Sequence, residues 1–292
     1  MNWKSRYFLP VFLLGCFCWG VNGNLSKTQA EEKSPPTSDF IRIHQNPQGK
    51  SLALETSLVP YESEDGEISV TLIGAIHLGE VDYYQKLNEE FQNYDAVLYE
   101  VVAEEGARPE SAAESGGVIG TSQRLMAYFL GMTFQIGSID YHAENMFHAD
   151  MTPEEFEKAI QQREEGFLVW YFRTLGYETA RKSERLTKED AQWLAFLLFP
   201  AKKHRLKRMM AEQMVDLDAS IVPVEGKKGS ALLQDRNEKV MRILQTRLDA
   251  GDRKIAIFYG AAHLPAMAGM LEKDFRLKKG EIRWIPAWDL TR

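Results

Sequence analysis

Two histidines stand in nearly the same short sequence near opposite ends of the chain. The sequence GAIHL at residues 74–78 recurs as GAAHL at residues 260–264, so His77 and His263 each lie three residues after a glycine. Each motif follows an apolar stretch that is typical of a buried strand. A glycine at such a point allows a sharp change of direction or a close backbone approach. We therefore expect both imidazoles at the carboxyl edge of one parallel sheet, facing the same crevice.

A carboxylate and a guanidinium are expected at the same edge. Glu100 interrupts the apolar run DAVLYEVV, and a buried carboxylate needs a metal ion, an arginine or a proton as its partner. Arg236 lies near the start of the helix that is expected before the strand of His263. A helix start and the end of the following strand lie at the same edge of the sheet. This geometry predicts that Glu100 and Arg236 converge with His77 and His263.

These residue types suit hydrolytic chemistry. Two imidazoles and a carboxylate with open positions can hold a divalent metal ion that acts on water or on a carbonyl group. His77, His263 and Glu100 are the candidate ligands, and Mn, Co, Zn or Fe suits such donors. Glu100 and Arg236 are the candidate catalytic groups, with Arg236 as a clamp for a substrate carboxylate or an oxyanion. In the alternative interpretation, both histidines only make hydrogen bonds that hold the strand ends, but their repetition favours a functional role.

Further ionisable residues lie in the stretch IDYHAENMFHADMTPEEF at residues 139–156. His148 and Asp150 are candidates for lining the crevice, and together with Arg236 and Asn237 they make up the candidate substrate-binding set. The stretch ends in TPEE at residues 152–155, which predicts a helix start. There Thr caps the helix, and the Glu three residues later closes a capping box.

The elements that must position these residues follow from apolar periodicity. Residues 68–76 and 95–102 are expected as strands joined by a helix over residues 81–93, which makes a βαβ unit. The C-terminal end is expected to repeat this layout, and a helical insertion of about residues 121–216 separates the two halves. The expected fold class is α/β, with a central, mainly parallel sheet built from two βαβ-like halves and capped by the insertion. In the C-terminal half, strands are expected at 220–224, 254–259 and 281–285, and helices at 232–248 and 264–275.

The N-terminal segment indicates export. Residues 1–30 combine a short basic start with an apolar run, as in a secretory signal. The sequence LLGC at residues 13–16 resembles a lipobox, in which Cys16 would carry a lipid that attaches the protein to a membrane. Ordinary cleavage, which gives a periplasmic or secreted protein, and an uncleaved anchor are the alternatives. The expected location is therefore the cell envelope or outside the cell.

The rest of the chain is expected to form one domain. Residues 31–39 are charged and rich in Pro and Ser, which is typical of a linker, so the domain spans residues 40–292. Both cysteines, Cys16 and Cys18, precede it, which excludes a disulfide, a cysteine nucleophile or a thiolate metal site within the domain.

Charge and missing motifs narrow the class of partner. The formal net charge of −7 argues against nucleic acid, and the basic run at residues 202–208 is interpreted as a solvated helix face. The chain contains no Gly-x-Ser-x-Gly elbow, P-loop, His-Glu-x-x-His or Gly-x-Gly-x-x-Gly motif. A peptide or another small molecule is therefore the expected ligand. The oligomeric state does not follow from the sequence.

Four segments, taken in order, resemble the TraB/PrgY/GumN group, which includes the TIKI proteases. The segments are GAIHLGEVDYYQKL, DAVLYE, DRNEKVMRIL and FYGAAHLPAM, within residues 68–102 and 232–271. In TIKI members the resemblance implies metal-dependent proteolysis, with the two histidines and the glutamate as site residues. In PrgY-like members it implies binding or inactivation of a peptide signal. The helical middle and residues 103–120 depart from the family pattern.

Together these features predict an exported, metal-dependent, peptidase-like hydrolase. The first alternative is a non-catalytic envelope lipoprotein that binds a peptide or a haem-like ligand in the same crevice. The second is a structural lipoprotein whose motif histidines hold the sheet ends together.

Overall fold

The computed structural model describes residues 38–109, 130–162, 203–224 and 233–291. They form an α/β fold around a mixed eight-stranded sheet, which confirms the expected fold class. The proposed signal, the linker up to residue 37 and much of the helical insertion lie outside the described residues. Within the described part of the chain, no helix has both the length and the apolar character needed to cross a membrane.

The sheet has a parallel half and an antiparallel half. The parallel half runs in the order β3 (Ser69–Ala75), β8 (Lys254–Gly260), β5 (Ala96–Tyr99) and β7 (Met146–His148). On the antiparallel side the long strand β2 (Ser51–Glu62) pairs with β3 and with three further strands. These are β1 (Ile41–Gln45), β9 (Lys278–Lys279) and β10 (Arg283–Asp289). A separate pair joins β4 (Leu78–Gly79) to β6 (Thr133–Phe134).

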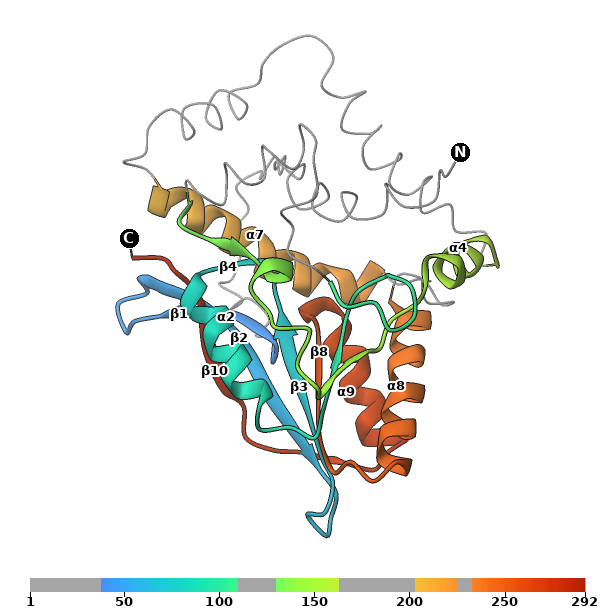
Figure 1. The fold of residues 1–292 in the computed structure, drawn as a ribbon. Helices are drawn as coiled ribbons and strands as arrows, with labels where there is room; N and C mark the ends of the chain where they lie inside the picture. Colours follow the sequence, from blue (N-terminus) through green and yellow to red (C-terminus); the bar gives the residue numbers. More distant parts are fainter. Residues whose placement is uncertain (1–37, 110–129, 163–202, 225–232, 292) are drawn as a thin grey trace, which may run out of the picture.

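In the described part of the chain, five α-helices lie against or beside the sheet (Figure 1). The helix α8 packs against α9 and contacts β5, while α2 contacts β10. The helix α7 crosses the edge at which the parallel strands end, and it contacts β1 and the short 3-10 turn Ala261–His263. The helices are α2 (Val81–Phe91), α4 (Pro153–Gln162), α7 (Lys203–Val224), α8 (Gln234–Asp249) and α9 (Leu264–Lys273).

The core explains why these segments form these elements. Strands β8 and β5 are continuous apolar runs, and all four residues of β5 and five consecutive residues of β8 are buried, as in a parallel strand covered on both faces. The helix α2 buries Tyr83, Tyr84, Leu87 and Phe91, which lie along one stripe. Between α2 and β8, Phe91 meets Phe258 edge to face, with ring centroids 5.0 Å apart.

Two details of the C-terminal half differ from the expectation. The prediction of a strand at residues 220–224 is wrong, because these residues form the end of the helix α7. A five-residue apolar run has too few residues for its periodicity to separate a strand from a buried helical turn. The last strand begins at Arg283 and lies antiparallel to β2, so β8, α9 and β10 do not repeat the parallel layout of β3, α2 and β5.

The basic run at residues 202–208 is also less solvated than expected. Lys207 is buried, and its ammonium group lies 2.6 Å from Glu80 Oε1. Arg208 donates to the backbone oxygen of Leu290 at 3.1 Å. These contacts fix α7 to the loop before α2 and to the end of β10. The described part of the basic run therefore also attaches α7 to the rest of the domain.

Candidate functional site

The site is built from residues that directly follow four neighbouring parallel strands. His77, His263, Glu100 and Asp150 come after β3, β8, β5 and β7, which are adjacent in this order. The register places Ala75 opposite Gly260, so the two glycine-histidine motifs leave the sheet at the same edge. Parallel strands bring their carboxyl ends together. The expected meeting of the two motifs is therefore confirmed at the level of the backbone.

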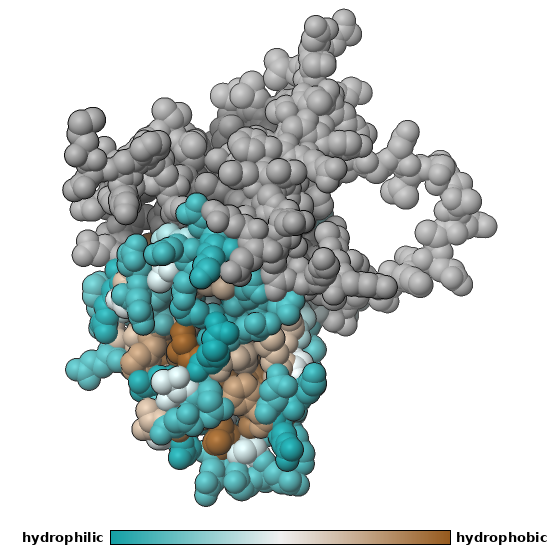
Figure 2. All heavy atoms as spheres, turned by 90° about the vertical axis from the view of Figure 1, so that its right-hand side faces the viewer, coloured by the Kyte–Doolittle hydropathy of each residue, from teal (hydrophilic) through white to brown (hydrophobic). Residues whose placement is uncertain are grey.

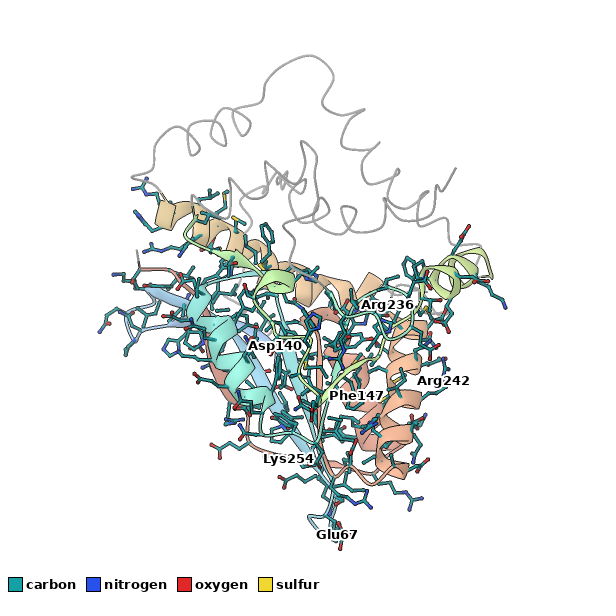
Figure 3. The ribbon with its side chains drawn as sticks, in the orientation of Figure 1. Glu67, Asp140, Phe147, Arg236, Arg242 and Lys254 are labelled. Carbon is teal, nitrogen blue, oxygen red and sulfur yellow. The ribbon has the colours of Figure 1, made fainter. Side chains whose placement is uncertain are left out.

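Arg236, in the first turn of α8, connects three of these groups. Its Nη2 lies 2.6 Å from Glu100 Oε1 and 2.5 Å from Asp150 Oδ2. Its Nε donates to Asp150 Oδ1 at 2.8 Å, and its Nη1 lies 3.3 Å from His263 Nε2. Arg236 is 2% exposed, whereas Arg242 of the same helix is exposed, and both are labelled in Figure 3. The arginine is thus enclosed by two carboxylates and an imidazole.

Glu100 is held as an ionised carboxylate. Its Oε2 accepts a hydrogen bond of 2.6 Å from the backbone N–H of Gly260, and its side chain is 9% exposed. Burial alone would raise the pKa of Glu100, but Arg236, the two neighbouring imidazoles and the hydrogen bond from Gly260 together outweigh it and lower the pKa to about 2. A buried negative charge therefore stands at the end of β5.

His263 is held as a neutral imidazole. Its Nδ1 lies 2.6 Å from Asn237 Oδ1, and Asn237 Nδ2 donates to the backbone oxygen of His263 at 3.4 Å. This amide orientation makes Nδ1 the protonated nitrogen and leaves the lone pair on Nε2. Burial of the ring lowers its pKa to about 4 and outweighs the attraction of Glu100 for a proton. The Nε2 lone pair then accepts from Arg236.

His77 differs from its counterpart in the second motif. It is the one exposed residue among the seven site residues predicted from the sequence, whereas His263 is buried. Its backbone oxygen accepts from the N–H of Gln135 at 3.0 Å, next to the β4–β6 pair. His77 contributes to the lowered pKa of both Glu100 and His263, so its ring lies within electrostatic range of them. The repeated motif therefore supplies one buried and one solvent-facing imidazole.

The residues predicted to bind substrate make internal contacts instead. Both oxygens of Asp150 contact Arg236, and Oδ1 also accepts from the backbone N–H of Met151 at 2.7 Å. Asn237 is bound to His263, and His148 Nε2 lies 2.7 Å from the backbone oxygen of Val101. Asp150 and Asn237 therefore position other site residues.

The capping box at the start of α4 is confirmed. Glu155 N–H donates to Thr152 Oγ1 at 3.2 Å, and Thr152 N–H donates to Glu155 Oε2 at 2.8 Å. This local signal marked the helix start correctly. It fixes the chain directly after Asp150, which is the point where β7 gives way to α4.

The arrangement of the donor atoms bears on the expected metal ion. Among residues 38–109, 130–162, 203–224 and 233–291, no group of three His, Cys, Asp or Glu side chains is placed to hold a metal ion. Glu100 Oε1 and His263 Nε2 lie 3.7 Å apart, but both contact the Arg236 guanidinium. The donors as they lie therefore do not fit a metal ion.

Sequence reasoning missed a buried pair beside the site. Gln135 Nε2 donates to the hydroxyl of Tyr141 at 2.9 Å, and burial together with the nearby charge of Glu100 raises the pKa of that hydroxyl. Within the described part of the chain, Gln135 Oε1 is buried without a hydrogen-bond partner. Gln135 begins a three-residue 3-10 helix and Tyr141 lies in a turn, so both segments are too short for periodicity to give a signal. Only the tertiary structure brings them next to the strand-end site.

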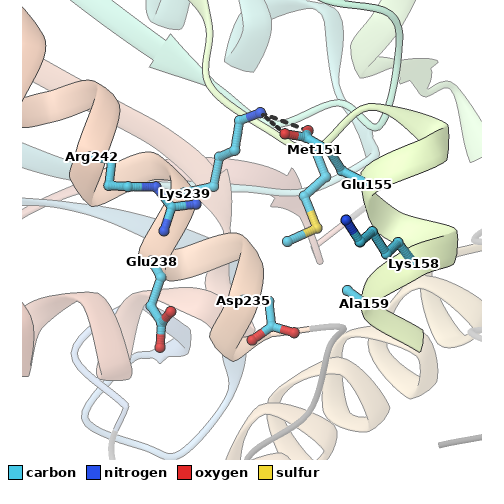
Figure 4. Close-up of a pocket in the computed structure, with 8 residues that line it drawn as sticks. All are labelled: Met151, Glu155, Lys158, Ala159, Asp235, Glu238, Lys239 and Arg242. Carbon is cyan, nitrogen blue, oxygen red and sulfur yellow. Dashed lines mark hydrogen bonds and ion pairs between the residues drawn. The ribbon is translucent and has the colours of Figure 1, made fainter. Parts of the chain in front are cut away.

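A separate groove of about 530 Å³ lies between α4 and α8 (Figure 4). Three acidic and three basic side chains line it, and Lys239 is bonded to Glu155 within it at 2.6 Å. Figure 2 looks onto this side of the molecule and shows a largely hydrophilic surface with scattered apolar residues. The balanced charge gives the groove no preference for a ligand of either sign.

The chain has no match in three comparisons with known proteins. No protein-family model, no curated protein and no solved structure matches it. The similarity to the TraB/PrgY/GumN group thus rests on the motif residues themselves.

Proposed function

We propose that this chain is an exported hydrolase of peptide bonds that acts at the carboxyl edge of β3, β8 and β5. One observation carries the proposal. The exposed imidazole of His77 lies at the strand edge within electrostatic range of two buried groups of fixed protonation, the ionised Glu100 and the neutral His263. Pairs of titratable groups whose surroundings set different protonation states are typical of acid-base sites.

His77 is the group that reacts with solvent. Histidine is the commonest general base in enzymes, and His77 is the exposed imidazole of this site. It takes a proton from the attacking water and returns it to the leaving amine. No step is assigned to a metal ion, because the donors do not fit one.

The charge of the cluster bears on the kind of substrate. Glu100, Asp150 and Arg236 sum to a formal charge of −1 when the histidines are counted as neutral. A carboxylate or phosphate next to the reacting bond is therefore disfavoured. A neutral amide bond meets no such repulsion, which supports a peptide as the substrate.

A binding function is the second candidate, and the contacts of Arg236 favour it. Arg236 was the expected partner for an oxyanion, but it is buried and paired with two protein carboxylates. A crevice without that donor can retain a peptide or a haem-like ligand through His77 and release it unchanged.

A peptide library separates the two candidates. The purified protein is incubated with the library, with and without a chelator, and the bound and released peptides are identified by mass spectrometry. New peptide termini that also form with the chelator support the hydrolase. Retention of intact peptides supports the binder. If peptides are neither cleaved nor retained, both candidates are contradicted.

We also propose that Cys16 carries a lipid that attaches the protein to the cell envelope. The proposal rests on the lipobox-like sequence LLGC. Cys18, two residues later, provides a matched control. Cys16→Ser should abolish incorporation of labelled palmitate and release the protein from the membrane fraction, whereas Cys18→Ser should change neither. Equal labelling of both variants would contradict lipidation at Cys16.

A further inference from the structure

We propose that Arg236 takes the place of a metal ion in this site, so that a guanidinium is the site's resident cation. The proposal concerns which cation the strand-end residues hold. It stands whether or not the site hydrolyses peptide bonds.

The first argument is the position of the guanidinium. Glu100 Oε1 and His263 Nε2 are 3.7 Å apart, a separation that two ligands of one ion can span with bonds of about 2.1 Å each. The two terminal nitrogens of Arg236 reach these same atoms, Nη2 at 2.6 Å and Nη1 at 3.3 Å. The guanidinium thus bridges the pair of donors that a metal ion would bridge.

The second argument is the state of the imidazole. Because Nδ1 of His263 faces the Asn237 carbonyl oxygen at 2.6 Å, the single lone pair of the ring is on Nε2. A metal-binding histidine commonly has its other ring nitrogen fixed in this way. Here the lone pair faces a guanidinium N–H. A metal ion could reach it only by displacing Arg236.

The third argument is the two-point ion pair between Asp150 and Arg236. Two nitrogens of Arg236 contact the two oxygens of Asp150, at 2.8 and 2.5 Å, and Asp150 is itself 1% exposed. Such a two-point contact fixes the plane of a guanidinium. A metal ion beside the retained arginine would add a second buried cation, and the two would repel each other.

Removal of the arginine should therefore create a metal site. Without its positive charge, Glu100 and Asp150 leave a formal charge of −2 beside His263. Two carboxylates and an imidazole suit Co²⁺ and Zn²⁺. Arg236→Met removes the charge and keeps an unbranched side chain. Arg236→Lys keeps a cation and is the matched control.

The experiment is a titration of the full protein with Co²⁺, followed by its visible absorption, together with thermal unfolding in Zn²⁺. Arg236→Met should bind one equivalent of Co²⁺, and saturating Zn²⁺ should raise its Tm by about 5 °C or more. The wild type and Arg236→Lys should show neither effect. Arg236→Met combined with His263→Ala should lose the gained binding.

Two results would overturn the proposal. One is binding of one equivalent of Co²⁺ by the wild type that is lost in His263→Ala and kept in His142→Ala, an exposed histidine elsewhere. The other is a folded Arg236→Met protein that binds no metal. The wild-type titration needs no folded Arg236 variant, and a wild type that binds no Co²⁺ through His263 supports the proposal.

Discussion

The backbone N–H of Gly260 donates to Glu100 Oε2 across 2.6 Å, which joins the second glycine-histidine motif to the carboxylate of the neighbouring strand. A side chain at this glycine would place its Cβ 3.2 Å from that oxygen. In the first motif, a Cβ at Gly74 would lie 3.0 Å from the backbone oxygen of Phe40. A side chain is therefore disfavoured at both glycines. At Gly260 it would crowd a site carboxylate, and at Gly74 it would crowd the backbone before β1.

Gly260→Ala should destabilise the protein and displace Glu100. The added methyl group forces a small shift of a buried, ion-paired carboxylate, which should cost about 1–3 kcal/mol in the free energy of unfolding. Gly269→Ala on α9 is the control, because its Cβ would meet nothing within 4 Å. That change should stabilise the helix by about 0.5–1 kcal/mol. Urea denaturation measures both variants, and equal effects would contradict the close-approach argument.

Asp150→Asn should be among the most destabilising isosteric changes at the site. The variant keeps the shape of Asp150 and removes half of the negative charge that balances the buried Arg236. Breaking a buried ion pair costs about 3–5 kcal/mol. Glu154→Gln, on the exposed first turn of α4, should change stability by less than about 0.5 kcal/mol. Similar unfolding midpoints for the two variants would show that Asp150 does not hold Arg236.

His263 should make the protein less stable in mild acid. Burial lowers its pKa from 6.5 to about 4, so between these values the unfolded chain binds a proton that the folded protein does not. The stability is complete above pH 6.5 and falls by about 3 kcal/mol as the pH drops toward 4. His263→Gln should lack this part of the pH dependence in urea titrations. An unchanged slope in the variant would refute the buried neutral imidazole.

Glu100 should make the stability of the protein depend on pH in a lower range than His263 does. Burial opposes ionisation of Glu100, but Arg236, together with the two imidazoles and the N–H of Gly260, lowers its pKa from 4.5 to about 2. The resulting stability, about 3 kcal/mol, is complete above pH 4.5 and is lost as the pH falls toward 2. Glu100→Gln should remove the pH dependence of the free energy of unfolding in this range. It should leave in place the pH dependence that His263 causes between about pH 4 and 6.5. If Glu100→Gln removed the pH dependence of both Glu100 and His263, the contributions of the two residues could not be separated.

Lys207→Met should loosen α7 from the sheet. The ammonium group of Lys207 is 3% exposed and bonds to Glu80, whose side chain is 23% exposed. Loss of this bond should cost about 1–3 kcal/mol, since the Glu80 carboxylate loses its cationic partner and keeps its contact with the backbone N–H of Asp289. Arg205→Met changes an exposed residue of the same helix and is the matched control. Hydrogen exchange should rise in α7 for the first variant alone.

The sequence was most informative where parallel strands end. Apolar periodicity located β3, α2 and β5, and chain direction then predicted that Glu100, Arg236 and His263 would meet. This worked because the carboxyl ends of parallel strands share one edge whatever their order in the sheet. The order itself, with β8 between β3 and β5, could not be inferred from local patterns.

The roles within the cluster were harder to predict. β7 has three residues, too few for a periodic signal, so Asp150 was not recognised as a strand-end residue. Arg236 was expected to face a ligand because a lone arginine in a sequence shows no partner. Only the tertiary structure reveals that two carboxylates already surround it. His77 and His263 look equivalent in sequence, yet their burial differs because different elements cover them.

The rate of peptide cleavage by His77→Ala tests the central claim most directly. His142→Ala serves as the control because His142 is exposed on a different segment. With a peptide that the wild type cleaves, His77→Ala should lower kcat/KM by about 10²–10⁴-fold, with unfolding unchanged, and His142→Ala should leave the rate unaltered. Cleavage at the wild-type rate by His77→Ala would contradict the account, because it would show that the solvent-facing imidazole at this edge takes no part in the reaction.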